Sequence, residues 1–581
     1  MKIRRLLMVL LAAALVLLSS GTPPAQAQSP SIPEAALSMP AAAPVANPAA
    51  ETVKVATVHF EPEEGAVAAN RADLVRLAKQ AARNGAKIIV FPEMATSGYS
   101  FFSRAEIATV AETIPGPSTN ALAAVANRYN VYIAFGMPQF DPKRNLYFNV
   151  AVLLGPTGKV EGVYKKRNNL IESSYNALYF GKMPTFDTKY GRLGLVICSD
   201  LFYSQFPRAT AVQGATILLA PANVGIETDF VKLRAYENDT AVVVANRYGT
   251  GSKGEKPISF SQETFTIPSS YVYDFNWGSR SVIVSHDGTV LSDHSAHTDN
   301  IGYGTLAVRD SRTFPVERRP SMYPLLAQDT LEGYTQTQFG QPATTTFAAA
   351  AVDPGTAPDP WAAALTAAED ADDEATAQNK TLRLIVFPGD YFPSDNESGV
   401  AELQTFAASK DVDLLLGYAE AGDQPPRSVL LTPSGTSYTY KRSHEWRGEG
   451  LTNLSDKYLV VDRDYARVAL LQDADMVAPE TSHVMARMGV DVVAVNADSD
   501  VPILSALWQS RTGDYLHIVV ANRAADEGIY HGGYKTDPSF VEDEGIVLAD
   551  LNTADIRTKP TARFFDYQSI LAPCAAAKNN C

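Results

Sequence analysis

The chain repeats its own sequence pattern, and this repeat limits the possible folds more than any other feature. Four segments of the first half, residues 88–92, 152–165, 187–195 and 243–247, return in the same order as residues 384–388, 429–441, 462–470 and 519–523. At 581 residues the chain is also longer than a single hydrophobic core usually extends. The repeat therefore predicts two copies of one fold joined in tandem.

Each copy alternates strands and helices in the way typical of a layered α/β fold. In the first copy, residues 53–59 alternate like a strand, and a helix with Asn70 as its N-cap ends near Gly85, before the buried strand 87–91. We expect further helices at 120–128, 206–213 and 229–239, and strands at 131–136, 149–154, 159–166, 192–198, 216–220 and 241–245, with 281–285 and 304–308 as a closing pair. The second copy starts near residue 346, with its first helix at 361–377.

The charge of the chain excludes some classes of partner. The formal net charge is −15, and no dense block of Lys or Arg is present, so we expect neither a nucleic acid nor an anionic membrane surface as partner. The eight histidines are dispersed without the spacing of metal ligands, and no glycine-rich phosphate loop is present. The sequence therefore predicts a small-molecule substrate, with no cofactor and no metal.

The N-terminus has the pattern of an export signal. A basic start is followed by the apolar run 6–18 and by a small-residue cleavage site at Ala25–Ala27. The apolar run is too short to predict a membrane span, so no membrane insertion is expected. Residues 1–27 are interpreted as a signal peptide and residues 28–50, rich in Pro and Ala, as a disordered spacer. The expected location is secreted or extracytoplasmic.

Export makes the three cysteines informative, because disulfides form outside the cytoplasm. Cys574 and Cys581 lie together in the tail 571–581, where they are expected to form a disulfide. That pairing leaves Cys198 as the odd thiol. The alternative is that a tail cysteine pairs with Cys198 or with another chain.

Cys198 ends a buried strand and is followed by the polar turn Ser199–Asp200. A lone cysteine is often a small core residue, but α/β folds display nucleophiles at such strand ends. The repeat helps to choose between these readings, because the second copy has Asp473 at the position of Cys198. The strand therefore forms without a thiol, which favours a nucleophile.

Two more reactive residues of the first copy are replaced in the second. Glu93 corresponds to Gly389, and Lys166 corresponds to Arg442. Either residue alone would be interpreted as a solvated surface charge. Together with a thiol they supply a base and a cation, which a cysteine nucleophile needs. The backbone N–H of Ser199 can help to hold an oxyanion.

This ordered set resembles the nitrilase, or carbon-nitrogen hydrolase, superfamily over residues 53–310. The resemblance rests on Phe-Pro-Glu-Met around Glu93, Tyr-Lys-Lys-Arg-Asn-Asn-Leu around Lys166 and Leu-Val-Ile-Cys-Ser-Asp-Leu around Cys198. It implies a four-layer α-β-β-α sandwich in which Glu93 is the general base, Lys166 stabilises the transition state and Cys198 forms the acyl-enzyme. Glu172 is a candidate auxiliary carboxylate that orients the lysine.

Within that superfamily the chain looks most like the biotinidase and vanin (pantetheinase) branch. The export signal, the segment 172–176 and the degenerate second copy carry this likeness, whereas the few cysteines and Ser199 depart from the animal members. The predicted organisation is a catalytic domain at 51–315, a linker at 316–345 and a non-catalytic domain at 346–570, similar to the vanin base domain. Asp390 is not expected to replace the missing base.

Candidate pocket residues follow the predicted strand ends. They are Tyr99, Tyr203 and Asn223, and each could equally serve packing. Arg247 is expected to be structural, because Arg523 persists in the copy that has lost the reactive groups.

The sequence thus predicts a secreted, cysteine-dependent amidase that cleaves a small linear amide through a thioester, of pantetheinase or biotinidase type. One alternative keeps the three residues but hydrolyses a nitrile or transfers the acyl group. The other is a non-catalytic binding or scaffold protein. Either a monomer or a homodimer fits, because the second copy could cover the face through which superfamily members pair.

Overall fold

The computed structural model describes residues 51–169, 172, 175–177, 179, 181–249, 256–260, 263–267, 279–296, 298–327, 340–393, 397–501, 503–524, 527–532, 539–541, 545–557 and 568–571. The predicted signal peptide, the predicted spacer and the predicted Cys574–Cys581 disulfide lie outside these residues. Within them Cys198 is a free, buried thiol.

The first copy is a sandwich of two six-stranded sheets. The first sheet has the order β14 (Asn300–Ala307), β1 (Thr52–His59), β2 (Ile88–Val90), β3 (Tyr132–Asp141), β4 (Leu146–Leu154) and β5 (Val160–Lys165). The second has the order β13 (Val290–His294), β12 (Ser281–Val284), β9 (Ala241–Asn246), β8 (Ile217–Ala222), β7 (Gly191–Leu195) and β6 (Thr185–Thr188). A separate hairpin is formed by β10 (Lys256–Phe260) and β11 (Glu263–Ile267).

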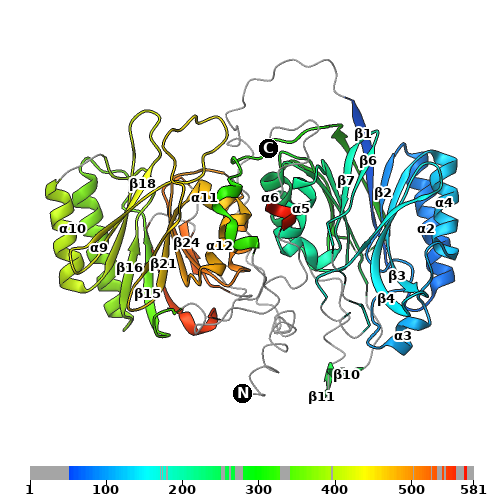
Figure 1. The fold of residues 1–581 in the computed structure, drawn as a ribbon, viewed down its shortest axis with the longest axis horizontal. Coiled ribbons are helices and arrows are strands. Elements are labelled where there is room, and N and C mark those ends of the chain that lie inside the picture. The colour runs from blue at the N-terminus through cyan, green and yellow to red at the C-terminus, as the bar shows by residue number, and fades with distance from the viewer. Residues whose placement is uncertain are drawn as a thin grey trace.

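The helices of the first copy cover the two outer faces of this sandwich. In Figure 1, α2 (Val67–Arg83) and α4 (Pro117–Tyr129) lie on the first sheet, while α5 (Gln205–Val212) and α6 (Thr228–Asn238) lie on the second. The short helix α3 (Arg104–Ala108) lies near the lower edge. This arrangement is the predicted α-β-β-α sandwich.

The second copy repeats the same topology strand for strand. Its first sheet has the order β26 (Ile546–Asn552), β15 (Thr346–Val352), β16 (Leu382–Val386), β17 (Asp413–Tyr418), β18 (Arg427–Leu431) and β19 (Ser437–Lys441). Its second sheet has the order β25 (Ser539–Val541), β24 (Glu527–Tyr530), β23 (His517–Asn522), β22 (Val492–Ala497), β21 (Arg467–Gln472) and β20 (Leu459–Asp462). The helices are α9 (Pro360–Ala377) and α10 (Glu397–Lys410) on one side and α11 (Asp473–Val477), α12 (Pro479–Arg487) and α13 (Leu504–Thr512) on the other.

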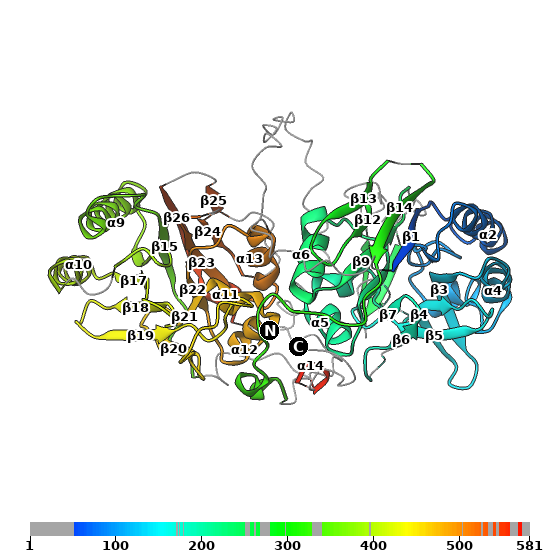
Figure 2. The ribbon, with the colours of Figure 1, turned by 90° about the horizontal axis from the view of Figure 1, so that it is seen from above.

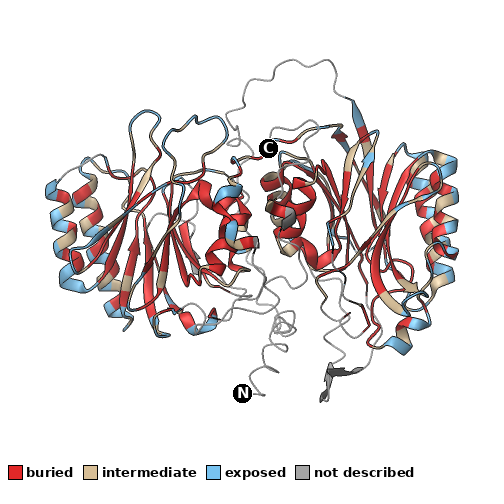
Figure 3. Cartoon of the chain, viewed as in Figure 1, coloured by how far each residue is buried: buried red, intermediate tan, exposed pale blue. Residues whose placement is uncertain are grey.

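The alternation of side chains along a strand explains how each sheet packs against the other sheet on one face and against helices on the other. In β1, Val53 and Val55 pack into the space between the sheets, whereas Ala56 and Val58 pack under the outer helices. Successive side chains of a strand point to opposite faces, so a strand covered on both faces is apolar throughout. The outer helices are buried on one side only, whereas the central ones are buried almost all round (Figure 3).

The two copies pack against each other through their inner helices. Viewed from above, α5 and α6 face α12 and α13 (Figure 2). One continuous apolar cluster extends from the first sandwich to the second and includes Leu233 and Trp508 on the facing helices. The chain contacts the second copy where the first copy ends, because Arg447 donates its backbone N–H to the carbonyl of Pro315 at 2.9 Å. The second copy therefore covers the inner helices of the first.

Two local predictions are wrong. Asn70 is not an N-cap, because α2 begins at Val67 and Asn70 lies inside the helix, where its side chain bonds both backbone groups of Glu63. The last two predicted strands are not a pair, because β12 lies between β9 and β13 whereas β14 pairs with β1 in the other sheet. Strand pairing of this kind is set by tertiary packing, which local sequence patterns do not report.

Among the described residues, no helix has the length and apolar character that crossing a membrane requires. The described residues after β14 also contain four short elements: the 3-10 turns η3 (Pro320–Met322) and η4 (Pro324–Ala327) in the predicted linker, and η5 (Thr553–Asp555) and α14 (Gln568–Leu571) near the C-terminus.

Candidate active site

Cys198 lies on a tight turn between β7 and α5. It opens the 3-10 turn η2 (Cys198–Phe202) with a backbone φ of +52°, a left-handed conformation that non-glycine residues rarely adopt. The side chain of Asp200 holds this turn, because it accepts hydrogen bonds from the Ile197 N–H at 3.1 Å and from the Tyr164 hydroxyl at 2.7 Å. Conformations of this kind persist only where surrounding contacts determine them, and they gather at functional sites.

Glu93 and Lys166 come from two strand ends of the first sheet. Glu93 follows β2, and Lys166 follows β5. The Lys166 Nζ lies 2.8 Å from Glu93 Oε1 and also donates to Glu172 Oε1. All three side chains are almost completely buried. The structure thus brings together an ammonium group and two carboxylates, one of which is the predicted auxiliary residue.

Burial and charge give the two carboxylates different acidities. Burial raises the pKa of Glu93 to about 7, although Lys166 acts to lower it. For Glu172, burial also opposes ionisation, but the Lys166 ammonium outweighs this effect and holds the pKa of Glu172 below its usual range. Two neighbouring carboxylates whose pKa values are shifted in opposite directions in this way can take different roles. Glu93 is the one that can exchange a proton near neutral pH.

The thiol lies next to this cluster. Cys198 is near enough to Glu93 to lower the pKa of that carboxyl, and its own pKa is raised well above the usual range, first by burial and then by the charge of Glu93. The Sγ contacts the carbonyl oxygen of Asn223 at 3.5 Å. Within the described part of the chain, Glu93 Oε2 has no hydrogen-bond partner. That oxygen is therefore available to accept a proton.

Sequence reasoning missed Asn149 in this site. Its side-chain amide donates to Glu93 Oε1 at 2.6 Å and to Glu172 Oε1 at 3.2 Å. Its backbone carbonyl accepts a hydrogen bond from the backbone N–H of Lys166. The sequence pattern predicts only that Asn149 lies in a strand. The one available signal was a polar residue inside an otherwise apolar strand, because a polar side chain that is buried in a strand needs a hydrogen-bond partner.

The other predicted site residues divide into two groups. The ring centroid of Tyr99 lies 5.8 Å from Lys166 Nζ, and both polar atoms of the Asn223 side chain are buried without a hydrogen-bond partner among the described residues. By contrast, Tyr203 packs on Phe206 and is close to Tyr515 of the second copy. Tyr99 thus lies beside Lys166 and Asn223 contacts Cys198 through its backbone, whereas Tyr203 lies towards the second copy.

Ser199 and Arg247 complete the set. The Ser199 N–H belongs to the first turn of η2, where backbone N–H groups lack partners within the turn. Its hydroxyl donates to the carbonyl of Asn168 at 3.1 Å. Arg247 is buried beside Phe60, with which it forms a β-bridge.

Comparison with known proteins supports the likeness suggested by the motifs. Residues 54–315 match the family model described as carbon-nitrogen hydrolase. The chain is 33% identical over 205 residues to a protein named nitrilase from Pyrococcus abyssi, an alignment that covers 34% of this chain and 76% of that relative. The chain belongs to the carbon-nitrogen hydrolase family.

Two further members of the family differ in their names. The citrullinase of Francisella tularensis is 26% identical over 298 residues, which covers 47% of this chain and 96% of the relative. The omega-amidase of Homo sapiens is 29% identical over 183 residues, which covers 29% of this chain and 65% of the relative. The three relatives are thus named nitrilase, citrullinase and omega-amidase, and these names alone assign no single substrate to this chain.

The second copy keeps the carbon-nitrogen hydrolase frame without the reactive groups. Tyr440 donates to Asp475 at 3.0 Å, which reproduces the bond from Tyr164 to Asp200. Arg442 bonds Glu449, and its Nη1 lies 3.9 Å from Asp473 Oδ1. A β-carbon added at Gly389 would lie 3.0 Å from the backbone of Ala497. A glutamate at this position would therefore require the backbone to move.

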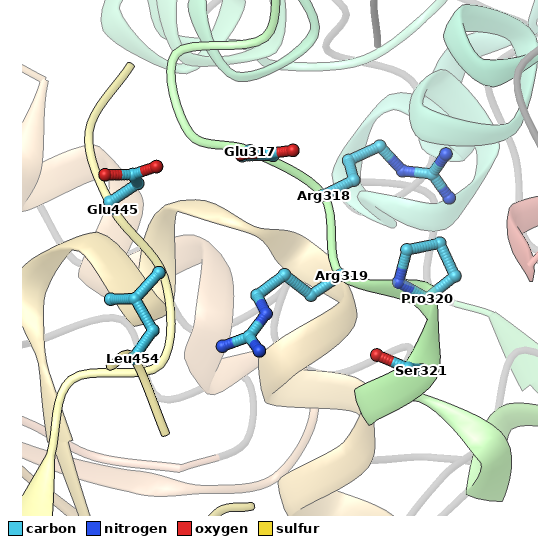
Figure 4. Close-up of a pocket in the computed structure, with 7 residues that line it drawn as sticks. All are labelled: Glu317, Arg318, Arg319, Pro320, Ser321, Glu445 and Leu454. Carbon is cyan, nitrogen blue, oxygen red and sulfur yellow. The ribbon is translucent and has the colours of Figure 1, made fainter. Parts of the chain in front are cut away.

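A small pocket lies elsewhere, between the predicted linker and the second copy (Figure 4). It has a volume of about 300 Å³. Linker side chains face two residues of the second copy across it, and the lining consists of Glu317, Arg318, Arg319, Pro320, Ser321, Glu445 and Leu454. None of the three predicted catalytic residues contributes to it. We therefore place the candidate active site at Cys198 and not at this pocket.

Proposed function

We propose that this carbon-nitrogen hydrolase is a cysteine-dependent amidase that cleaves a small linear amide at Cys198. The observation that carries the proposal is the buried cluster in which Lys166 bonds Glu93 and Glu172 beside the thiol. This cluster contains each group that the reaction needs: a nucleophile, a base with a pKa of about 7 and a fixed positive charge.

The reaction follows from these positions. Glu93 takes the thiol proton as Sγ attacks the carbonyl carbon, and the resulting oxyanion is held by the Lys166 ammonium and the Ser199 N–H. Glu93 then gives the proton to the leaving nitrogen, the C–N bond breaks and a thioester remains on Cys198. Water, deprotonated by Glu93, attacks the thioester and releases the acid. Neither a metal nor a cofactor takes part in these steps.

Lys166 keeps its proton throughout. Its pKa is raised well above the usual range, because the charges of Glu172 and Glu93 outweigh the effect of burial. The residue can therefore stabilise negative charge but cannot act as the base. Asn223, whose buried amide has no hydrogen-bond partner among the described residues, is a suitable group to bind the substrate.

The proposal also includes the substrate specificity, the location and the oligomeric state of the enzyme. Pantetheinase- or biotinidase-like specificity rests on the sequence likeness to that branch, and none of the three relatives named above carries either name. The predicted export signal at residues 1–27 supports the proposal of a secreted enzyme. Because the second copy covers the inner helices of the first, a monomer can be the active form.

The similarity to a protein named nitrilase favours one second candidate, in which the same cysteine attacks a nitrile. A nitrile would give a thioimidate on Cys198, which water converts to the thioester with release of ammonia. Both substrates reach the same thioester, so the two candidates are distinguished by whether the amides or the nitriles of a panel are turned over.

The test is hydrolysis of a panel of small amides and nitriles by the mature chain, together with intact-mass spectrometry. We expect turnover and an acyl adduct that both disappear in Cys198→Ala. The matched control is Asp473→Ala, the equivalent position of the second copy, which should keep its kcat. Turnover that persists in Cys198→Ala, or no turnover and no adduct with any compound, would reject the amidase and favour a binding protein.

A further inference from the structure

The second copy contacts the segment that directly follows the candidate nucleophile. His483 of α12 bonds Ser204 directly before α5. Ser510 of α13 acts through Arg234, which bonds the carbonyls of Leu201 and Phe202 at the end of η2. We propose that these residues of the degenerate copy are positioning residues for Cys198. The inference rests on the proposed function, because it concerns the rate of the reaction assigned to that thiol.

Arg234 makes the first connection. Its Nε donates to the carbonyl of Leu201 at 2.6 Å, and its Nη2 donates to the carbonyl of Phe202 at 3.0 Å. The same Nη2 donates to Ser510 Oγ at 2.8 Å across the boundary between the copies. The guanidinium group is completely buried, so it cannot exchange these partners for water. The hydroxyl of Ser510 thus helps to fix the group that holds the end of η2.

Glu237 links this arginine to its counterpart in the second copy. It bonds Arg234 Nη1, and its Oε2 lies 2.8 Å from Arg511 Nη2. Arg511 in turn donates to the carbonyls of Met476 at 2.9 Å and of Val477 at 3.0 Å, the positions equivalent to Leu201 and Phe202. Each copy therefore holds its own turn by one arginine, and the buried Glu237 joins the two.

His483 makes the second connection. Its Nε2 lies 3.2 Å from Ser204 Oγ, and its Nδ1 lies 2.8 Å from Asp514 Oδ1. A Ser-His-Asp series of this kind also occurs in serine hydrolases. Here, however, the exposed fractions of Ser204 and His483 are 5% and 4%, and both lie between packed helices, which closes them to a substrate. The contact therefore serves to hold Ser204 at the start of α5.

The chemistry of the site explains why this support matters. Cys198 has a left-handed backbone conformation, and the Ser199 N–H must point at the developing oxyanion. Loss of one oxyanion donor costs about 100-fold or more in kcat, and small misplacements of reacting groups are also costly. A variant in which the turn loses one of these hydrogen bonds can remain folded and still have a lower kcat. We therefore expect the second copy to act on kcat more than on substrate binding.

The experiment compares Ser510→Ala, Ser510→Thr and the double variant Ser510→Ala/His483→Gln with the wild type. We expect kcat of Ser510→Ala to fall by about tenfold with KM changed by less than about twofold, a partial loss compared with removal of an oxyanion donor. Threonine keeps the hydroxyl and should restore kcat. The double variant should lose more, and the rate of Cys198 alkylation by iodoacetamide should change in the same order.

Arg447→Gln is the matched control. Arg447 also joins the two copies, through the carbonyl of Phe314 at 3.0 Å, but it does not touch η2, so its kcat should not change. Thermal unfolding is measured for every variant. A kcat that is unchanged in both Ser510→Ala and the double variant overturns the inference, as does a loss that threonine does not restore. An inactive wild type would instead reject the proposed function.

Discussion

Removal of the Asn149 amide should shift the pH dependence of the enzyme. The amide donates to the ionised form of Glu93 at 2.6 Å, so Asn149→Ala removes a bond that favours ionisation. A hydrogen bond to a charged group contributes about 1.5–3 kcal/mol, and about 1.4 kcal/mol corresponds to one pKa unit. The pKa of Glu93 should therefore rise by about one to two units.

The sign and the size of the effect on rate follow from this shift. Glu93 must be ionised to take the thiol proton, and its pKa is about 7 in the intact site. The acidic limb of kcat/KM should thus lie near pH 7 in the wild type and about one to two pH units higher in Asn149→Ala. At pH 7 the variant should be about 5- to 50-fold slower, and the difference should shrink as the pH rises.

The assay is a profile of kcat/KM from pH 5 to 10 with one substrate of the active panel. Asn127→Ala is the control, because the Asn127 amide donates to the carbonyl of Pro156 in an exposed turn on the outer side of the fold, away from the two carboxylates. Its acidic limb should match that of the wild type. An acidic limb in folded Asn149→Ala that stays in place or moves to lower pH would refute the reasoning.

Three further predictions address the charged groups. Lys166→Met should lower kcat by about 100-fold or more, measured at the optimum pH, because the oxyanion loses its cation. Burial raises the pKa of Asp473 from 3.8 to about 6, so ionisation costs the fold about 3 kcal/mol above pH 6. Asp473→Asn should therefore stabilise the chain in urea unfolding, with a gain that grows from pH 4 to pH 7 and is then constant; a gain that is independent of pH contradicts this. Tyr164→Phe should lower the free energy of unfolding by about 1–3 kcal/mol and reduce kcat, because buried Asp200 loses a donor.

The reactive groups were predictable because each lies in a short motif. Glu93 follows an apolar strand, Lys166 follows another and Cys198 precedes a polar turn, so local patterns indicated where each side chain would emerge. The internal repeat supplied the comparison that an isolated motif lacks. Because β21 forms with Asp473 directly after it, this strand does not require a thiol at that position.

Other contacts could not be read from the sequence. The bond from Asn149 to two carboxylates depends on the register of β4 against β5, which places Asn149 opposite Lys166. The predicted cap at Asn70 failed for a similar reason, because its amide bonds Glu63 and Thr96, and Thr96 lies on a separate loop. A side-chain partner that is distant in sequence carries no periodic signal.

The sequence by itself determined that there are two copies of one α/β fold and that only the first retains the three candidate catalytic groups. Tertiary structure alone decided how the copies meet, namely that α12 and α13 cover α5 and α6, that Ser510 bonds Arg234 and that His483 bonds Ser204. The physical reason is that hydrophobic periodicity specifies which face of an element is buried, but not against which element. That choice belongs to the packing of the whole chain.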